Sequence, residues 1–204
     1  GRLGETDEDE KEIEPDGETA LFVFKTLTDK YGKNSFFKVI SGKLSADVPA
    51  YNTRASEQER MGKMLFLKGD KQEDTAVITA GDIGVVTKLD SFKTGDTLAA
   101  PKSDLQLAGV NYPAASLSMA IRSKKKGEED KVAAGLNRIS VEDPTVKFAT
   151  NVETHEQVLS ALGEQHIDTI VGKLKNRFNV EVELSVPKVA YRETITKIAS
   201  AEGK

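Results

Sequence analysis

The hydrophobic period of the chain changes at Pro101, and no other feature of its 204 residues constrains the fold as strongly. Before that proline, the β-branched and aromatic runs are short, and turn signals separate them about every ten residues. No stretch with helical spacing interrupts these runs. Short strands at this spacing, without helices, predict a small closed β-barrel or sandwich. The clearest runs are 20–27, 36–40, 64–67, 76–78 and 83–86.

The first run predicts which residues share a face of the strand, and the turn signals predict where the chain connects one strand to the next. Alternation in 20–27 places Leu21, Val23 and Lys25 on one face of a strand, with the two phenylalanines between them on the other. The predicted turns all contain a glycine, which tolerates the positive φ of a tight turn. They lie at 31–34, 41–43, 69–70, 81–82 and 95–96.

The pattern after Pro101 predicts a second domain that contains helices. One helix begins with acidic residues at 128–130, where the positive end of the helix dipole favours them, and it ends at Asp143-Pro144. Another begins near Gly163 and has an apolar face that extends to Phe178. Strands are predicted at 116–122, 146–148, 157–162 and 180–186. This order predicts an α+β, ferredoxin-like βαββαβ domain.

Charge divides the chain unevenly. The net charge is −4, yet residues 1–18 hold nine acids and two basic residues, so the remainder carries a net charge of +3. The acidic stretch has almost nothing apolar to bury, which predicts a disordered leader over 1–17. The basic balance of the body is compatible with a polyanionic partner. Its densest basic cluster is Lys124, Lys125 and Lys126, which is either a solvated loop or a phosphate contact.

Several classes of protein lack their required residues here. The chain has no cysteine and two histidines, so disulfides and a structural zinc site are excluded and no metal ligands are predicted. No apolar run reaches the ~18 residues of a membrane span, and no secretion signal begins the sequence. Phosphate-loop, nucleophile-elbow and His-Glu-x-x-His motifs are absent, so no catalytic residue is predicted. His166, beside the apolar face of the second helix, is predicted to be structural, and His155 to be solvated.

Motifs in both halves resemble one family. Residues 162–168, Leu-Gly-Glu-Gln-His-Ile-Asp, resemble the Gly-Met-Gly-Glu-Leu-His-Leu-Asp signature of elongation factor G, and 186–195 resemble its Pro-x-Val-Ala-Tyr-Arg-Glu-Thr signature. Residues 138–144 resemble the Leu-x-x-Glu-Asp-Pro element of the same family. In the barrel, residues 36–42 resemble the family motif Phe-Phe-Arg-Val-Tyr-Ser-Gly. Residues 80–83 and 94–98 resemble two further turns of the family. The resemblance spans about residues 20–196.

The resemblance implies that the chain is a fragment containing domains II and III of a translational GTPase. The GTPase domain, with its GTP and Mg²⁺, and domain IV would belong to the full-length protein, so no cofactor and no GTP hydrolysis are expected here. The implied parts are a leader, the domain II barrel, a linker, domain III and the start of the connection to domain IV. Their predicted bounds are 1–17, 18–103, 104–114, 115–187 and 188–204.

The family also implies partners and contacts. The barrel is expected to dock on small-subunit ribosomal RNA, and domain III to relay between the GTPase domain and the rest of a cytoplasmic, monomeric factor, in contact with a small-subunit protein but not with a membrane. Candidate RNA contacts in the barrel motif are Phe37, Lys38, Ser41 and Gly42, and the further basic candidates are Lys43, Arg54, Arg60 and Lys63. Lys124, Lys125 and Lys126 are the phosphate-contact candidates of domain III.

Departures from the family motifs leave alternatives open. Gln165 replaces a leucine, Ala161-Leu162 replaces Gly-Met, and Ile40 replaces a tyrosine. These changes favour a paralogue over the principal factor, and they leave open a fragment of a ribosomal-protection tetracycline-resistance protein. A free-standing RNA- or protein-binding module is a further alternative.

Overall fold

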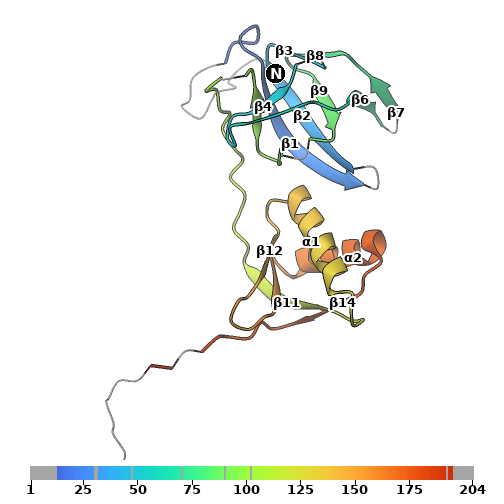
Figure 1. Cartoon of the computed structure of the whole chain (residues 1–204), viewed down its shortest axis with the longest axis vertical. Coiled ribbons are helices and arrows are strands. Elements are labelled where there is room, and N and C mark those ends of the chain that lie inside the picture. The colour runs from blue at the N-terminus through green and yellow to red at the C-terminus, as the bar shows by residue number, and fades with distance from the viewer. Residues whose placement is uncertain are drawn as a thin grey trace, which may run out of the picture.

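Two folded bodies follow one another along the chain, joined by an extended linker (Figure 1). The computed structural model describes residues 13–29, 32–46, 48–69, 71–89, 91–101, 103–191 and 193–194. Predictions for 1–12, and for 195–204 at the other end, lie outside these residues. Among the described residues, no helix is both long enough and apolar enough to cross a membrane.

The first body is a β-barrel whose main sheet has the strand order β5-β4-β10-β1-β2-β9-β6-β7, with β3 paired to β8 beside it. All of its strand pairs are antiparallel. The strands are β1 (Ala20–Asp29), β2 (Gly32–Ser41), β3 (Lys43–Ser45), β4 (Ala50–Asn52), β5 (Glu57–Glu59), β6 (Met64–Lys68), β7 (Lys71–Asp74), β8 (Val77–Thr79), β9 (Ile83–Thr87) and β10 (Thr97–Ala99).

Strict alternation along β2 organises the barrel core. Its odd-numbered residues from Lys33 to Ser41 are buried, while the residues between them are half-buried. Phe37 and Val39 pack inside with Leu21 and Val23 of β1. The apolar alternation seen in the sequence therefore separates inside from outside, as an antiparallel strand with one buried face requires.

A bulge in β1 changes which of its residues face the core, so part of the prediction for this strand is wrong. The register against β2 shifts between Val23 and Lys25. Leu21 and Val23 are buried as predicted, but Lys25 is exposed and Thr26 takes the next buried position. An extra residue on one strand reverses the faces of every residue after it. The Lys25 ammonium instead lies 5.6 Å from the centre of the Phe36 ring.

Two other expectations are corrected by backbone pairing. Of the predicted turn at 31–34, residues 32–34 already belong to β2 and pair with β1, and Tyr31 lies outside the described residues. The disordered leader predicted over 1–17 does not include 13–17. There the Pro15 carbonyl accepts a 2.8 Å hydrogen bond from the Gly42 N–H, and the Glu14 carbonyl accepts one of 3.0 Å from the Gly17 N–H.

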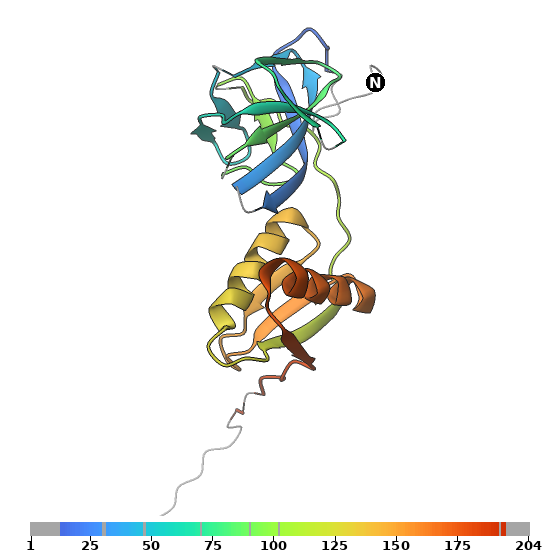
Figure 2. The same cartoon turned by 90° about the vertical axis from the view of Figure 1, so that its right-hand side faces the viewer.

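The second body is the α+β domain, with two helices on one face of an antiparallel sheet ordered β12-β13-β11-β14 (Figure 2). This is the ferredoxin-like βαββαβ arrangement. Apolar residues of both helices, among them Leu136 and Leu174, pack on Ile121 and Leu159 of the sheet. The elements are β11 (Leu117–Ser123), α1 (Glu129–Glu142), β12 (Lys147–Thr150), β13 (Gln157–Ala161), α2 (Glu164–Phe178) and β14 (Val182–Ser185).

Candidate functional site

Lys38 lies on the outer side of the barrel, as the alternation predicts. Its neighbours inside the strand, Phe37 and Val39, are buried, whereas Lys38 is half-buried on the opposite face. Across the strands it is paired with Phe22 of β1 and Ile83 of β9. Ile83 keeps 54% of its surface exposed. The lysine stem thus stands between two apolar neighbours on the outer face of the sheet.

Phe37, Ser41 and Gly42, the other candidate RNA contacts of the 36–42 motif, do not offer a free surface or hydrogen-bond donor to RNA. Phe37 is fully buried in the core, so it has no surface for an RNA contact. The Gly42 N–H already donates to the Pro15 carbonyl, and the Ser41 hydroxyl donates to the Glu18 carbonyl at 2.5 Å. These donors are used to hold the 14–18 segment, which corrects the expectation that they approach phosphate.

The remaining basic residues of the barrel are spread over different elements and have different surroundings. Lys43 is exposed at the start of β3 and lines an open cleft together with residues 15–19. Arg54 lies 3.9 Å from an oxygen of Asp96. Lys63 forms a 2.7 Å ion pair with Asp74. Arg60 is exposed just after β5.

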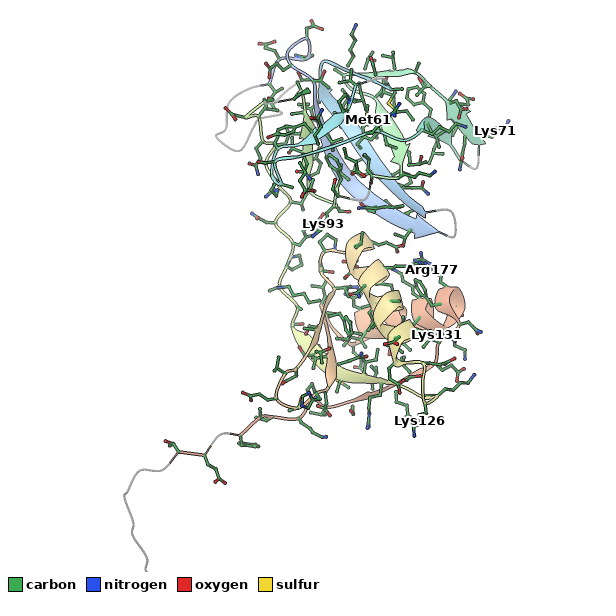
Figure 3. All side chains as sticks on the ribbon, viewed as in Figure 1. Met61, Lys71, Lys93, Lys126, Lys131 and Arg177 are labelled. Carbon is green, nitrogen blue, oxygen red and sulfur yellow. The ribbon has the colours of Figure 1, made fainter. Side chains whose placement is uncertain are left out.

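The lysine cluster of the α+β domain lies far from these residues. Lys124, Lys125 and Lys126 are exposed in the turn after β11, and Figure 3 places Lys126 at the end of the domain that points away from the barrel. The Lys124 N–H donates to the Glu181 carbonyl at 2.9 Å. Lys175, followed by Lys124 and Lys125, lowers the pKa of the Glu181 carboxyl. This lysine cluster is therefore separate from the basic candidates of the barrel.

A polar cluster that the sequence pattern did not single out joins the two bodies. Glu142, the last residue of α1, accepts hydrogen bonds from the Thr28 N–H at 2.8 Å and from the Thr28 hydroxyl at 2.5 Å. Arg177 of α2 donates to both oxygens of the same carboxylate at 2.8 Å. Arg177 also donates to the Thr28 carbonyl. One signal in the sequence was available: an acid ends a helix, where the dipole disfavours it.

The next residue, Asp143, holds the α+β domain together internally. One carboxylate oxygen accepts from the Thr145 N–H at 3.0 Å and its hydroxyl at 2.6 Å, and the other lies 3.1 Å from His166 Nε2. His166 Nδ1 lies 3.3 Å from the Leu162 nitrogen. These contacts give His166 a structural role, as predicted. His155 is exposed in its loop.

Comparisons with known proteins cover both bodies. A family model described as "Elongation factor G domain 2" matches residues 18–100, and one described as "Elongation Factor G, domain III" matches residues 112–186. The crystal structure of a protein from Thermus thermophilus superposes with a TM-score of 0.75 at 28% sequence identity. The match covers 92% of this chain and 29% of that protein, so the chain spans less than a third of its length.

Proposed function

The chain belongs to the elongation factor G family and contains its domains II and III, and from this premise we propose that it binds the small ribosomal subunit through the outer face of its barrel. In this proposal the contact is made with ribosomal RNA. Domain III relays movement between the GTPase domain and the rest of a cytoplasmic translation factor, in contact with a small-subunit protein. The proposal concerns translocation during protein synthesis.

The position of Lys38 carries the RNA-binding part of the proposal. It is a cation on the outer face of β2, in the motif 36–42 that resembles the family barrel, and Phe22 and Ile83 flank it. Contacts between lysine and phosphate position a protein on RNA without reading sequence, and they require an outward-facing cation rather than a fixed geometry. Lys43, beside an open cleft, also fits this requirement.

In this proposal, GTP hydrolysis belongs to the GTPase domain of the full-length factor and not to domains II and III. The 204 residues contain no Gly-x-x-x-x-Gly-Lys-Ser/Thr loop, and such a loop supplies the backbone N–H groups and the hydroxyl that hold a triphosphate and Mg²⁺. We therefore propose that this chain does not hydrolyse GTP, and that the full-length factor does so in its GTPase domain.

Binding to purified small ribosomal subunits tests the barrel contact. The fluorescently labelled chain is titrated with subunits at several salt concentrations, and the variant Lys38→Glu is compared with Lys71→Glu. Lys71 is an equally charged, exposed residue of the edge strand β7. The proposal predicts that Lys38→Glu weakens binding and reduces the slope of log affinity against log salt by about 1, because one fewer counterion is released. Equal effects of the two variants would contradict it.

A further inference from the structure

The end of helix α1 carries a charge in an unfavourable place. Glu142 is its last residue, and its last turn contains no basic residue. Backbone carbonyls give a helix C-terminus partial negative charge, so a carboxylate there is disfavoured within its own helix. The Glu142 side chain is nevertheless only 6% exposed. A nearly buried carboxylate at such a position needs hydrogen-bond donors from outside its own helix.

Those donors come from both domains. Arg177 approaches from α2 of the same domain, while the Thr28 N–H and hydroxyl approach from β1 of the barrel. The end of β1 lies close to the end of α1 (Figures 1 and 2), and the two elements are in contact. Oε1 of Glu142 accepts one hydrogen bond from Arg177 and two from Thr28. The two from Thr28 exist only when the barrel is docked on domain III.

Arg177 is oriented for the same contact. Its guanidinium lies 5.5 Å from the centre of the Phe178 ring, and Arg138 lies 6.0 Å from the same ring. With that support, Arg177 donates to the carboxylate of Glu142 and also to the Thr28 carbonyl. A planar guanidinium held against a ring loses less freedom when it forms such bonds. The arginine thus contacts both domains at once.

The segment that connects the two domains is exposed over most of its length. The linker is attached to the barrel as far as Leu107, which is buried and whose N–H donates to the Thr97 hydroxyl at 3.0 Å. Residues 108–114 are exposed. Ser116 is already attached to domain III, because its N–H donates to the Ala161 carbonyl at 3.0 Å. Eight residues, from 108 to 115, therefore lie between the two attached ends, and a free chain of that length spans about 15 Å.

We propose that Thr28, Glu142 and Arg177 form an interdomain latch that fixes the barrel against domain III, and that opening this latch converts one rigid body into two bodies joined by residues 108–115. In the relay proposed above for domain III, the latch would be the contact that changes between a docked and a released state. It does not depend on ribosome binding, and its test uses the chain without ribosomes.

Distance measurements between the two domains test the latch. The chain has no cysteine, so Lys71→Cys and Lys126→Cys introduce two unique sites for spin labels, one on each domain (Figure 3). Pulsed electron resonance then gives the distribution of distances between the labels. We expect one narrow distribution for the parent chain and a distribution at least twice as wide for Glu142→Gln, in which the charge that binds Arg177 and Thr28 is lost.

Matched variants separate the latch from a general loss of stability. Thr28→Val removes one donor from the barrel side and leaves the Glu142–Arg177 pair intact, so it should also widen the distribution. Glu129→Gln changes an exposed acid at the opposite end of α1 and should leave it narrow. Circular dichroism at 222 nm checks that the helices of every variant are folded. A wide distribution in the parent chain, or unchanged widths in both Glu142→Gln and Thr28→Val, would overturn the proposal.

Discussion

His166 Nε2 lies 3.1 Å from an oxygen of Asp143, which ties the first turn of α2 to the residue that follows α1. The neighbouring carboxylate, Glu142, is bound by the barrel as well as by α2. Two consecutive acids therefore serve different contacts: Asp143 joins the two helices of domain III, and Glu142 joins domain III to domain II.

Replacing Asp143 should destabilise domain III. Asp143→Ala removes the acceptor for Thr145 and His166, and we expect the free energy of unfolding to fall by about 1–3 kcal/mol because buried donors lose their partner. Helices α1 and α2 both belong to domain III, so ellipticity at 222 nm during urea unfolding follows that domain. Asp168→Ala, an exposed acid on α2, is the control. An equal loss in both variants would argue against a specific role of Asp143.

Two helical glycines should respond to alanine in opposite directions. Gly172 has open space where a Cβ would stand, so Gly172→Ala should stabilise α2 by about 0.5–1 kcal/mol through helix propensity. At Gly135 the added Cβ would lie 2.7 Å from Leu174 Cδ2 and 3.3 Å from the Phe178 ring. Gly135→Ala should therefore destabilise domain III by about 1–2 kcal/mol. Thermal unfolding at 222 nm measures both, and stabilisation by Gly135→Ala would show that the contact between the helices is looser than these distances indicate.

The interdomain latch should open in acid. Burial opposes ionisation of Glu142, but the hydrogen bonds from Arg177 and Thr28 outweigh it and leave the pKa of the carboxyl below its usual 4.5. A group with a lowered pKa stabilises the docked state above the unperturbed value, and this stabilisation is lost as the pH falls through the lowered one.

The distance between the spin labels, measured from pH 7 to pH 3, tests this dependence. The parent distribution should stay narrow at pH 5 and widen only below about pH 4.5, while Glu142→Gln should be wide throughout. The pKa of Asp143 is lowered as well, where burial is opposed by hydrogen bonds from Thr145 and by His166. Ellipticity at 222 nm, recorded in parallel, separates unfolding of domain III from opening of the latch. Widening between pH 7 and pH 5.5 would contradict the assignment to Glu142.

The chain should not bind GTP. Its 204 residues hold no phosphate loop, so no set of backbone N–H groups is expected to enclose a triphosphate. Isothermal titration with GTP and Mg²⁺ should show no heat of binding at micromolar concentrations. A saturable micromolar signal would mean that the chain holds a nucleotide site of another kind.

The sequence predicted the two folds because each depends on local periodicity. Alternation in β2 and the apolar faces of α1 and α2 placed the barrel and the βαββαβ domain correctly. Five barrel strands were missed, namely β3, β4, β5, β7 and β10. Four of them have only three residues each, too few to show a period, and the four residues of β7 are all exposed and polar, without alternation. The inward turn of Thr26 was also missed, because the bulge after Val23 depends on pairing with β2 rather than on the local sequence.

The candidate site was predicted less completely, for a related reason. The outward direction of Lys38 follows from alternation, but the use of Ser41 and Gly42 by the 14–18 segment requires tertiary structure. Thr28 and Glu142 are 114 positions apart. Their contact depends on how two domains dock, and no periodicity within either domain encodes it.

Photo-crosslinking from position 38 tests the central claim most directly. A photoreactive amino acid is placed at Lys38 and, as the control, at Lys71 on the edge strand β7, and each labelled chain is irradiated with purified small ribosomal subunits. We expect an adduct with ribosomal RNA from position 38, reduced by added salt, and little from position 71. No RNA adduct from position 38, or equal yields from both positions, would contradict binding through this face of the barrel.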